Sequence, residues 1–187
     1  SDPDWVKRFQ CVAWEYEERF HSDVFTGDSA AAFIQQQQLD RPFFLEVGFP
    51  GPHEPWDPPQ RFIDLYQDAD WPPPVGGPGD LETKPPQYTS RLEEIAPGPD
   101  GQVGHDSKID MRKASAKDLE NMQRHYYANV SLVDEQVGKI LDALEERGLR
   151  ENTWIFFASD HGDMLGDHGL VYKGPMAEGW VRVPLIV

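Results

Sequence analysis

The feature that most constrains the fold of this sequence is a long apolar repeat in its second half. Apolar side chains recur there at intervals of three and four, at Leu119, Met122, Tyr126, Val130, Val133, Val137, Ile140 and Leu144. This period predicts one amphipathic helix over residues 116–147. Ser115-Ala116-Lys117-Asp118 precedes it as a capping box with Asp in the last place. Gly148 supplies the stop.

Short apolar runs lie on both sides of this helix. Residues 42–49 and 153–158 are nearly continuous apolar segments, which is typical of buried strands in a parallel sheet. Helices are also predicted over residues 5–20 and 28–39, the second with Asp28 as its N-cap. A strand, a long crossover helix and another strand favour an α/β fold with a parallel sheet.

Residues 57–110 form an excursion that is rich in proline and glycine. Proline fixes φ and removes a hydrogen-bond donor, and glycine loses much backbone entropy on ordering, so we expect little regular structure there. A loop of this length is either a lid that faces a substrate or a variable surface insertion.

Composition excludes several classes of partner. Lys and Arg number 17 against 33 Asp and Glu, for a formal charge of −16, which argues against an extended surface for nucleic acid or anionic membrane. A single cysteine, Cys11, excludes an internal disulfide framework. No apolar run has the roughly 20 residues that span a bilayer, and no basic-then-apolar leader opens the chain. A cytoplasmic location is slightly favoured, and the oligomeric state stays open.

The residues after the second apolar run are the strongest candidates for chemistry. Residues 159–169 read Ser-Asp-His-Gly-Asp-Met-Leu-Gly-Asp-His-Gly, with three carboxylates, two imidazoles and three glycines. Ligands of open α/β sheets bind at the carboxyl ends of strands. Asp160 there suits a hard divalent cation, and adjacent His161 widens the choice to Mn²⁺, Fe²⁺ or Zn²⁺. The alternative is an ordinary polar turn.

His53 follows the first apolar run in the segment Pro52-His53-Glu54-Pro55-Trp56. Prolines on both sides fix the backbone, so the imidazole is held in place. Such a histidine can protonate a leaving group or contact an anion. The alternative is a surface loop whose histidine packs incidentally near Trp56.

The two segments together resemble the sulfatase family of the alkaline phosphatase superfamily. Residues 159–169, followed by Lys173-Gly174-Pro175 and residues 182–187, are similar to its C-terminal signature, and residues 43–56 resemble its central signature. The resemblance covers most of the chain. It implies an alkaline phosphatase-like α/β fold, a parallel sheet sandwiched by helices, with residues 1–187 as the central part of a larger catalytic domain.

The resemblance implies a metal-dependent hydrolase of a small anionic ester. Sulfate monoesters are the expected substrates, as in arylsulfatases. Phosphonate or phosphate esters are the alternative, because an Asp-His pair is closer to choline-sulfatases and phosphonate monoester hydrolases than to Asp-Asn arylsulfatases. A non-catalytic binding module with the same fold is the third possibility.

The resemblance also implies a role for each site residue. Asp160 and His161 match the later pair of metal ligands, with calcium or manganese as the expected ion. Lys173 matches the lysine that touches the ester oxygens, and His53 matches the histidine at the transferring group or leaving oxygen. His168 is either a further substrate contact or a hydrogen-bonding support, and Asp163 and Asp167 are expected to be supports.

The family nucleophile, however, has no counterpart at Cys11. That nucleophile is a formylglycine made from Cys or Ser in a C/S-x-P-x-R motif, whereas Cys11 has neither the proline nor the arginine at those spacings. We therefore expect Cys11 to be a structural residue of the first helix. The formylglycine and an aspartate pair are expected in a preceding part of the protein, so these 187 residues alone should be inactive.

Overall fold

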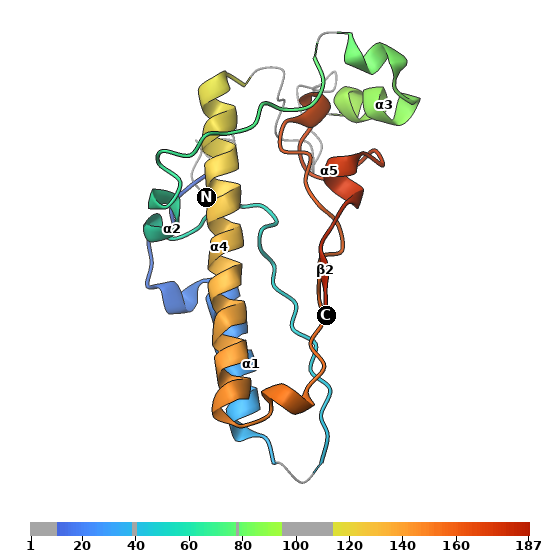
Figure 1. Cartoon of the computed structure of the whole chain (residues 1–187). Coiled ribbons are helices and arrows are strands. Elements are labelled where there is room, and N and C mark those ends of the chain that lie inside the picture. Colours follow the sequence, from blue (N-terminus) through green and yellow to red (C-terminus); the bar gives the residue numbers. More distant parts are fainter. Residues whose placement is uncertain (1–10, 39–40, 78, 95–113) are drawn as a thin grey trace. The chain divides into compact units, whose positions relative to one another are not determined.

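The computed structural model describes residues 11–38, 41–77, 79–94 and 114–187 (Figure 1). The chain forms two compact units. Unit 1 comprises Ser1–Phe9, Asp70–Gln123 and Ile155–Val187, and unit 2 comprises Gln10–Ala69 and Arg124–Trp154. The elements in chain order are η2 (Glu18–Phe20), α1 (Ser22–Gln36), α2 (Gln60–Asp64), η3 (Asp80–Thr83), α3 (Pro86–Glu94), α4 (Ala116–Glu146), η5 (Arg150–Asn152), β1 (Phe157–Ala158), η6 (Asp167–Gly169), α5 (Glu178–Val181) and β2 (Leu185–Ile186).

Helix α4 confirms the prediction from the apolar repeat, with both of its ends as expected. Ser115 Oγ accepts a hydrogen bond from the Asp118 N–H at 3.2 Å, and the Asp118 carboxylate accepts one from the Ser115 N–H at 2.8 Å. At the other end Gly148 takes φ +64°, and the Leu149 N–H returns to the Leu144 carbonyl at 2.9 Å. The capping box and the left-handed glycine thus satisfy backbone groups that the helix ends leave unpaired.

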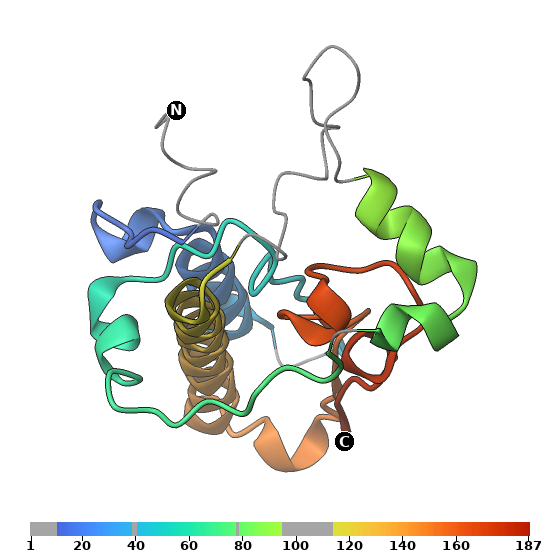
Figure 2. The same cartoon turned by 90° about the horizontal axis from the view of Figure 1, so that it is seen from above.

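The core of unit 2 lies between α1, α2 and α4. Figure 2 looks nearly along α4 and shows α1 beside it. The buried residues that pack together there are Val24, Phe62, Ile63, Ala128 and Leu132. The two long helices approach closely at Gly27, where a Cβ would lie 2.6 Å from Cβ of Gln136. A side chain at this position of α1 would push the helices apart.

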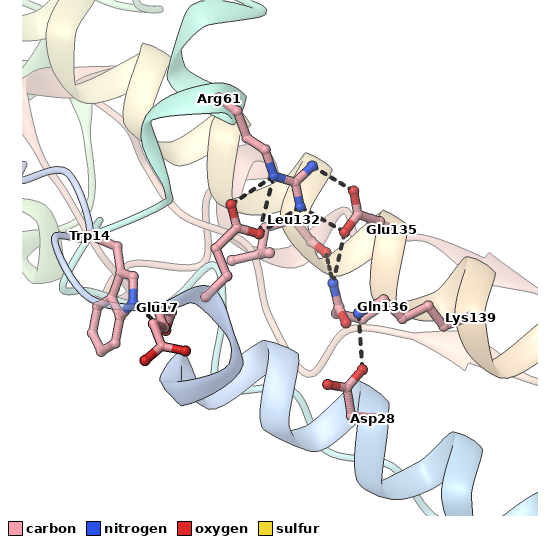
Figure 3. A network of polar contacts seen from close by, with 9 residues as sticks. Trp14, Glu17, Asp28, Arg61, Leu132, Glu135, Gln136 and Lys139 are labelled. Atoms are coloured by element: carbon pink, nitrogen blue, oxygen red, sulfur yellow. Dashed lines mark hydrogen bonds and ion pairs between the residues drawn. The ribbon is translucent and has the colours of Figure 1, made fainter.

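Arg61 adds a polar network at the edge of this core (Figure 3). Its guanidinium donates to the carboxylates of Glu18 and Glu135, with shortest distances of 2.8 and 2.7 Å. Lys139 of α4 pairs with Asp28 of α1 at 2.9 Å. These pairs join segments that are far apart in the sequence.

The N-terminal helices differ from the prediction. The sequence predicted helices over residues 5–20 and 28–39, but in the described part residues 11–17 carry no helix and α1 begins at Ser22. The reason for the earlier start is His21, whose ring Nδ1 accepts from the Asp23 N–H at 3.2 Å and so caps the helix. The predicted N-cap, Asp28, lies inside α1. Residues 5–10 lie outside the described residues.

Cys11 belongs to an extended segment, which corrects its placement in a helix. The segment forms parallel bridges between Cys11 and Trp56 and between Trp14 and Pro59. Cys11 is 4% exposed and Trp56 is fully buried. The prediction of a structural cysteine is consistent with this burial.

The proline-rich excursion also contains more regular structure than predicted. Helices α2 and α3 and the turn η3 lie within residues 57–94, while residues 95–110 lie outside the described part. The segment 79–88 packs into the core of unit 1. That core contains Tyr88, Met164, Leu170 and Ala177, with Leu81 and Trp180 against it. Apolar contacts over a long sequence separation fix a segment whose own composition predicts a loop.

The predicted buried strands are the largest departure from the sequence prediction. No strand is assigned within residues 42–49, and only Phe157–Ala158 of the second run forms one, which pairs antiparallel with Leu185–Ile186. Burial was also wrong, since Phe44 is 89% exposed and Trp154 is 82% exposed. A strand needs a hydrogen-bonded neighbour. Of the two predicted runs, only Phe157–Ala158 has such a neighbour among the described residues, namely Leu185–Ile186.

Among the helices of the described ranges, none combines the length and apolar character required to cross a membrane.

Candidate functional site

The loop of residues 159–173, which follows β1 in unit 1, carries the candidate residues Asp160, His161 and Lys173. The Asp163 carboxylate shapes it by accepting from the Leu165 N–H at 2.9 Å and from the Tyr172 N–H at 3.0 Å. Gly162 donates its N–H to the Trp180 carbonyl at 2.7 Å. A Cβ on Gly162 would lie 2.1 Å from the Gly179 carbonyl oxygen. Only glycine allows this close approach, so the sequence Asp-His-Gly has a steric reason for its third residue.

Asp160, His161 and Lys173 come together in this loop. His161 Nδ1 lies 2.8 Å from the Gly162 carbonyl oxygen, which can only accept, so Nδ1 carries the ring proton. Nε2 therefore presents its lone pair, 3.2 Å from Lys173 Nζ and 3.6 Å from Asp160 Oδ2. The Asp160 side chain is 86% exposed. From the family resemblance, Asp160 and His161 are expected as metal ligands and Lys173 as a contact to the ester oxygens.

The donor atoms of this group fit part of a metal site. A metal-bound histidine commonly donates its other N–H to a carbonyl, as His161 does, and offers the second nitrogen to the ion. The Asp160 carboxylate beside it is accessible. Within the described ranges, however, no group of three or more His, Cys, Asp or Glu side chains is arranged to hold a metal. Asp160 and His161 therefore offer one carboxylate and one imidazole nitrogen, which is fewer groups than a complete metal site requires.

His168 has partners of its own in unit 1. Its Nδ1 lies 2.5 Å from Asp80 Oδ2, and its side chain is 9% exposed. The Tyr88 ring meets it edge to face at 5.4 Å between centroids. Asp167 next to it accepts from the Val75 N–H at 2.7 Å. Asp163 and Asp167 both accept backbone hydrogen bonds, and their support of the site stays a prediction. The Asp80 partner of His168 was not predicted.

His53 belongs to unit 2, in a turn closed by its N–H to the Pro50 carbonyl at 3.1 Å. Its ring is half exposed, and Nδ1 lies 3.0 Å from the Glu54 carbonyl oxygen. Trp56 anchors the segment by donating Nε1–H to the Pro52 carbonyl at 3.1 Å while its ring is fully buried. The peptide bonds Gly51–Pro52 and Glu54–Pro55 are cis.

A buried carboxylate from α1 supports the loop that carries His53. Asp23, which is 2% exposed, accepts from the Gly51 N–H at 3.0 Å. Burial raises the pKa of the Asp23 carboxyl above its ordinary value, although the Gly51 hydrogen bond acts in the opposite direction. His21 beside it accepts at Nδ1, so its ring proton is on Nε2, which faces Asp57 Oδ1 at 3.4 Å. His21, Asp23, Asp57 and His53 all line one cavity of about 280 Å³.

Sequence reasoning missed Asp23 and Asp80, which support His53 and His168. Each lies far from its partner in the chain, and neither stands in a motif. The weak signal for Asp23 is a carboxylate in the first turn of a helix, which ordinarily indicates only a favourable contact with the helix dipole. Asp80 lies among prolines and glycines and offers no signal of its own.

Three comparisons with known proteins bear on this site. The sequence model described as Sulfatase matches residues 4–187. An arylsulfatase of Clostridium perfringens is 34% identical over 183 residues, which cover 98% of this chain and 34% of that protein. A choline-sulfatase of Rhizobium meliloti is 33% identical over 171 residues, covering 86% of this chain and 31% of that protein.

The fold has solved counterparts. The crystal structure of a phosphonate monoester hydrolase of Agrobacterium radiobacter superposes with a TM-score of 0.71 at 26% identity, over 92% of this chain and 34% of that one. This likeness confirms the α/β fold class that the sequence predicted, although the sheet of the described residues has two strands, β1 and β2, beside the isolated bridges of Cys11 and Trp14. The chain spans about a third of the length of these relatives. The family model covers nearly all of its residues, so the chain belongs to the sulfatase family.

Proposed function

We propose that this chain is the part of a metal-dependent ester hydrolase that holds the later metal ligands and the cationic contacts to the substrate. Sulfate monoesters are the favoured substrates. The observation that carries the proposal is the grouping of Asp160, His161 and Lys173 around His161 Nε2, within a chain of the sulfatase family. Asp160 and His161 would hold a divalent cation, which offsets negative charge on the ester oxygens when bound.

The other side chains have roles that follow from their chemistry. The Lys173 ammonium would contact the non-bridging oxygens, where charge accumulates during transfer. Its present hydrogen bond to His161 Nε2 uses the lone pair that a metal requires, so we expect Lys173 to leave this nitrogen when an ion binds. His53 would protonate the leaving oxygen as a general acid.

The nucleophile is expected outside these residues. No Cys or Ser in the sequence begins a C/S-x-P-x-R motif, and Cys11 is buried in an extended segment. Formylglycine made from such a motif is the nucleophile that the family implies. We therefore expect the 187-residue chain to bind a metal ion weakly and to hydrolyse nothing.

A metal titration tests the first half of this proposal. Mn²⁺ added to the isotope-labelled chain should broaden the NMR signals of residues 160–162 and 173 in a saturable way, with a Kd of roughly 10⁻⁴–10⁻³ M or weaker for a partial site. Asp160→Ala or His161→Ala should abolish the effect. Asp142→Ala removes an exposed carboxylate on α4 and serves as the control. Broadening that persists in both site variants would contradict the assignment.

An activity assay tests the second half. The purified chain should not release 4-nitrophenol from 4-nitrophenyl sulfate with Mn²⁺ or Ca²⁺ present, and turnover would show that a nucleophile lies within it. In the whole enzyme, Lys173→Ala should lower kcat by about 10²–10³-fold, the effect typical of one contact to a developing oxyanion. A non-catalytic binding module would show metal binding without turnover in either form.

A phosphonate or phosphate ester is the second candidate substrate. It is supported by histidine at position 161 and by the structural likeness to a phosphonate monoester hydrolase. Paired assays of the whole enzyme on phenyl sulfate and on a phosphonate monoester with the same leaving group, phenyl methylphosphonate, decide between the two. A clear excess of kcat/KM on the phosphonate would overturn the sulfatase assignment.

A further inference from the structure

Unit 1 contains a cavity of about 310 Å³ that His168 lines. Asp160, His161 and Lys173 are not among its lining residues. The volume lies at the lower end of the range for small-molecule sites, roughly 300–1,000 Å³. Its polar lining includes Lys84, His168 and Glu178, and its apolar lining includes Tyr88 and Met176.

The Asp80 carboxylate determines what His168 offers to this cavity. An ionised carboxylate can only accept, so the short contact from Asp80 Oδ2 places the ring proton on Nδ1 of His168. The neutral ring then has an acceptor at Nε2. Within the described ranges this nitrogen makes no hydrogen bond, although the side chain is nine-tenths buried.

The backbone holds the His168 ring in place. The His168 N–H donates to the Val75 carbonyl at 2.7 Å, and the residue itself lies in the left-handed region at φ +56°. Gly76, at φ +96°, packs so closely that a Cβ there would lie 2.8 Å from His168 Nδ1 and 2.9 Å from Asp80 Oδ2. The acceptor nitrogen is therefore fixed before any ligand arrives, which reduces the entropy cost of binding.

The charges around the cavity select among classes of ligand. The lining carries both signs of charge, with the carboxylates of Asp167 and Glu178 and the ammonium of Lys84, which lies 3.8 Å from Asp80 Oδ1, so a ligand of a single charge meets a group of like charge in it. An uncharged hydroxyl group is both donor and acceptor. It can donate to His168 Nε2 and accept from Lys84, while carbon atoms contact Met176.

We propose that this cavity binds an uncharged, hydroxyl-bearing group, with His168 Nε2 as acceptor and Asp80 as the positioning residue that sets the tautomer of His168. The further step, that this group is the alcohol part of the ester, rests on the proposed function. Binding of a free polyol is independent of the proposed function, because such binding requires neither a metal ion nor hydrolysis.

Histidine ring NMR on the ¹⁵N-labelled chain tests the proposal, with methyl α-D-glucopyranoside as the probe. We expect the two ring nitrogens of His168 to show the Nδ1–H tautomer, and the Nε2 signal to shift in a saturable way as the glucoside is added. The rings of His53 and His161 should not move. Choline chloride and sodium sulfate, the cationic and anionic probes, should leave His168 unchanged.

Variants separate the positioning role from general stability. Asp80→Ala should lose the tautomer signature and weaken glucoside binding by about 2- to 10-fold, the equivalent of one hydrogen bond. Asp80→Asn keeps an acceptor oxygen and should restore both. Lys84→Met should weaken binding without changing the tautomer, and Glu82→Gln, an exposed change in η3, should alter neither.

The proposal is overturned by an absent or non-saturable shift at His168, by a shift with choline or sulfate alone, or by unchanged binding in both Asp80→Ala and Lys84→Met. None of these outcomes bears on metal binding at Asp160, so failure here is distinguishable from failure of the proposed function.

Discussion

Replacing Asp23 with alanine and with asparagine should change stability very differently, because this carboxylate has two opposing effects. Its oxygen accepts from the Gly51 N–H, which stabilises the loop before His53. Its charge is buried in a side chain only 2% exposed, which costs free energy and raises the pKa of the carboxyl. Asparagine keeps an acceptor oxygen without the charge, whereas alanine removes both.

The magnitudes follow from these two effects. Asp23→Ala leaves the Gly51 N–H without its acceptor and should cost about 1–3 kcal/mol in the free energy of unfolding. Asp23→Asn should lie within about 1 kcal/mol of the wild type at pH 7, on the stabilising side. Asp142→Asn, on the exposed face of α4, is the matched control and should change little.

The pH dependence gives the sign that tests the reasoning. Because the pKa of Asp23 is higher in the folded state than its ordinary value of 3.8, protonation favours folding. Its stabilising contribution is complete below the ordinary pKa and is lost as the pH rises through the folded-state pKa. The advantage of Asp23→Asn should therefore be largest at pH 7 and shrink toward pH 4.

Urea unfolding followed by tryptophan fluorescence at pH 4, 5.5 and 7 measures these differences. Trp56 is fully buried in the same unit and should report the transition. If Asp23→Asn at pH 7 costs as much as Asp23→Ala, the acceptor oxygen is not what matters and the reasoning is refuted. An advantage that grows as the pH falls would refute it equally. The His53 ring signal should move in the alanine variant only.

Three further perturbations have expected results. Leu132→Ala should cost about 2–5 kcal/mol in urea unfolding, because Leu132 is fully buried in the core of unit 2, and a cost below 1 kcal/mol would contradict that packing. Gly76→Ala should abolish the His168 tautomer signature in ring NMR, because a Cβ there would lie 2.8 Å from His168 Nδ1. Gly79→Ala is the control, since Gly79 also has a positive φ but has no neighbour closer than 3.8 Å to a Cβ. It should reduce stability by about 1–2 kcal/mol and keep the signature. Arg61→Met should cost up to about 1 kcal/mol at pH 7, since its partners are more than a third exposed. Arg61 lowers the pKa of both partner carboxylates in the folded state, so this cost should begin to fall near their ordinary pKa of 4.5 and be lost as the pH falls through the lowered values. A cost independent of pH would exclude the ion pairs as its cause.

Local signals succeeded where the physical cause is itself local. The period of α4, its Ser115 capping box and its Gly148 stop all act within a few residues, and each was predicted correctly. The predicted start of α1 was wrong because the N-cap is a histidine, His21, and not one of the usual cap residues Ser, Thr, Asp and Asn. The predicted strands failed because pairing depends on neighbours that the run of apolar residues does not specify.

The sequence by itself determined the family and the identity of the candidate side chains, because the signatures around His53, Asp160, His161 and Lys173 are compact and contiguous. Only the tertiary structure decided which groups support them. Asp23 reaches the His53 loop across 28 residues, and Asp80 reaches His168 across 88. Such contacts depend on how distant segments pack, and a buried acceptor leaves no periodic or local pattern in the sequence.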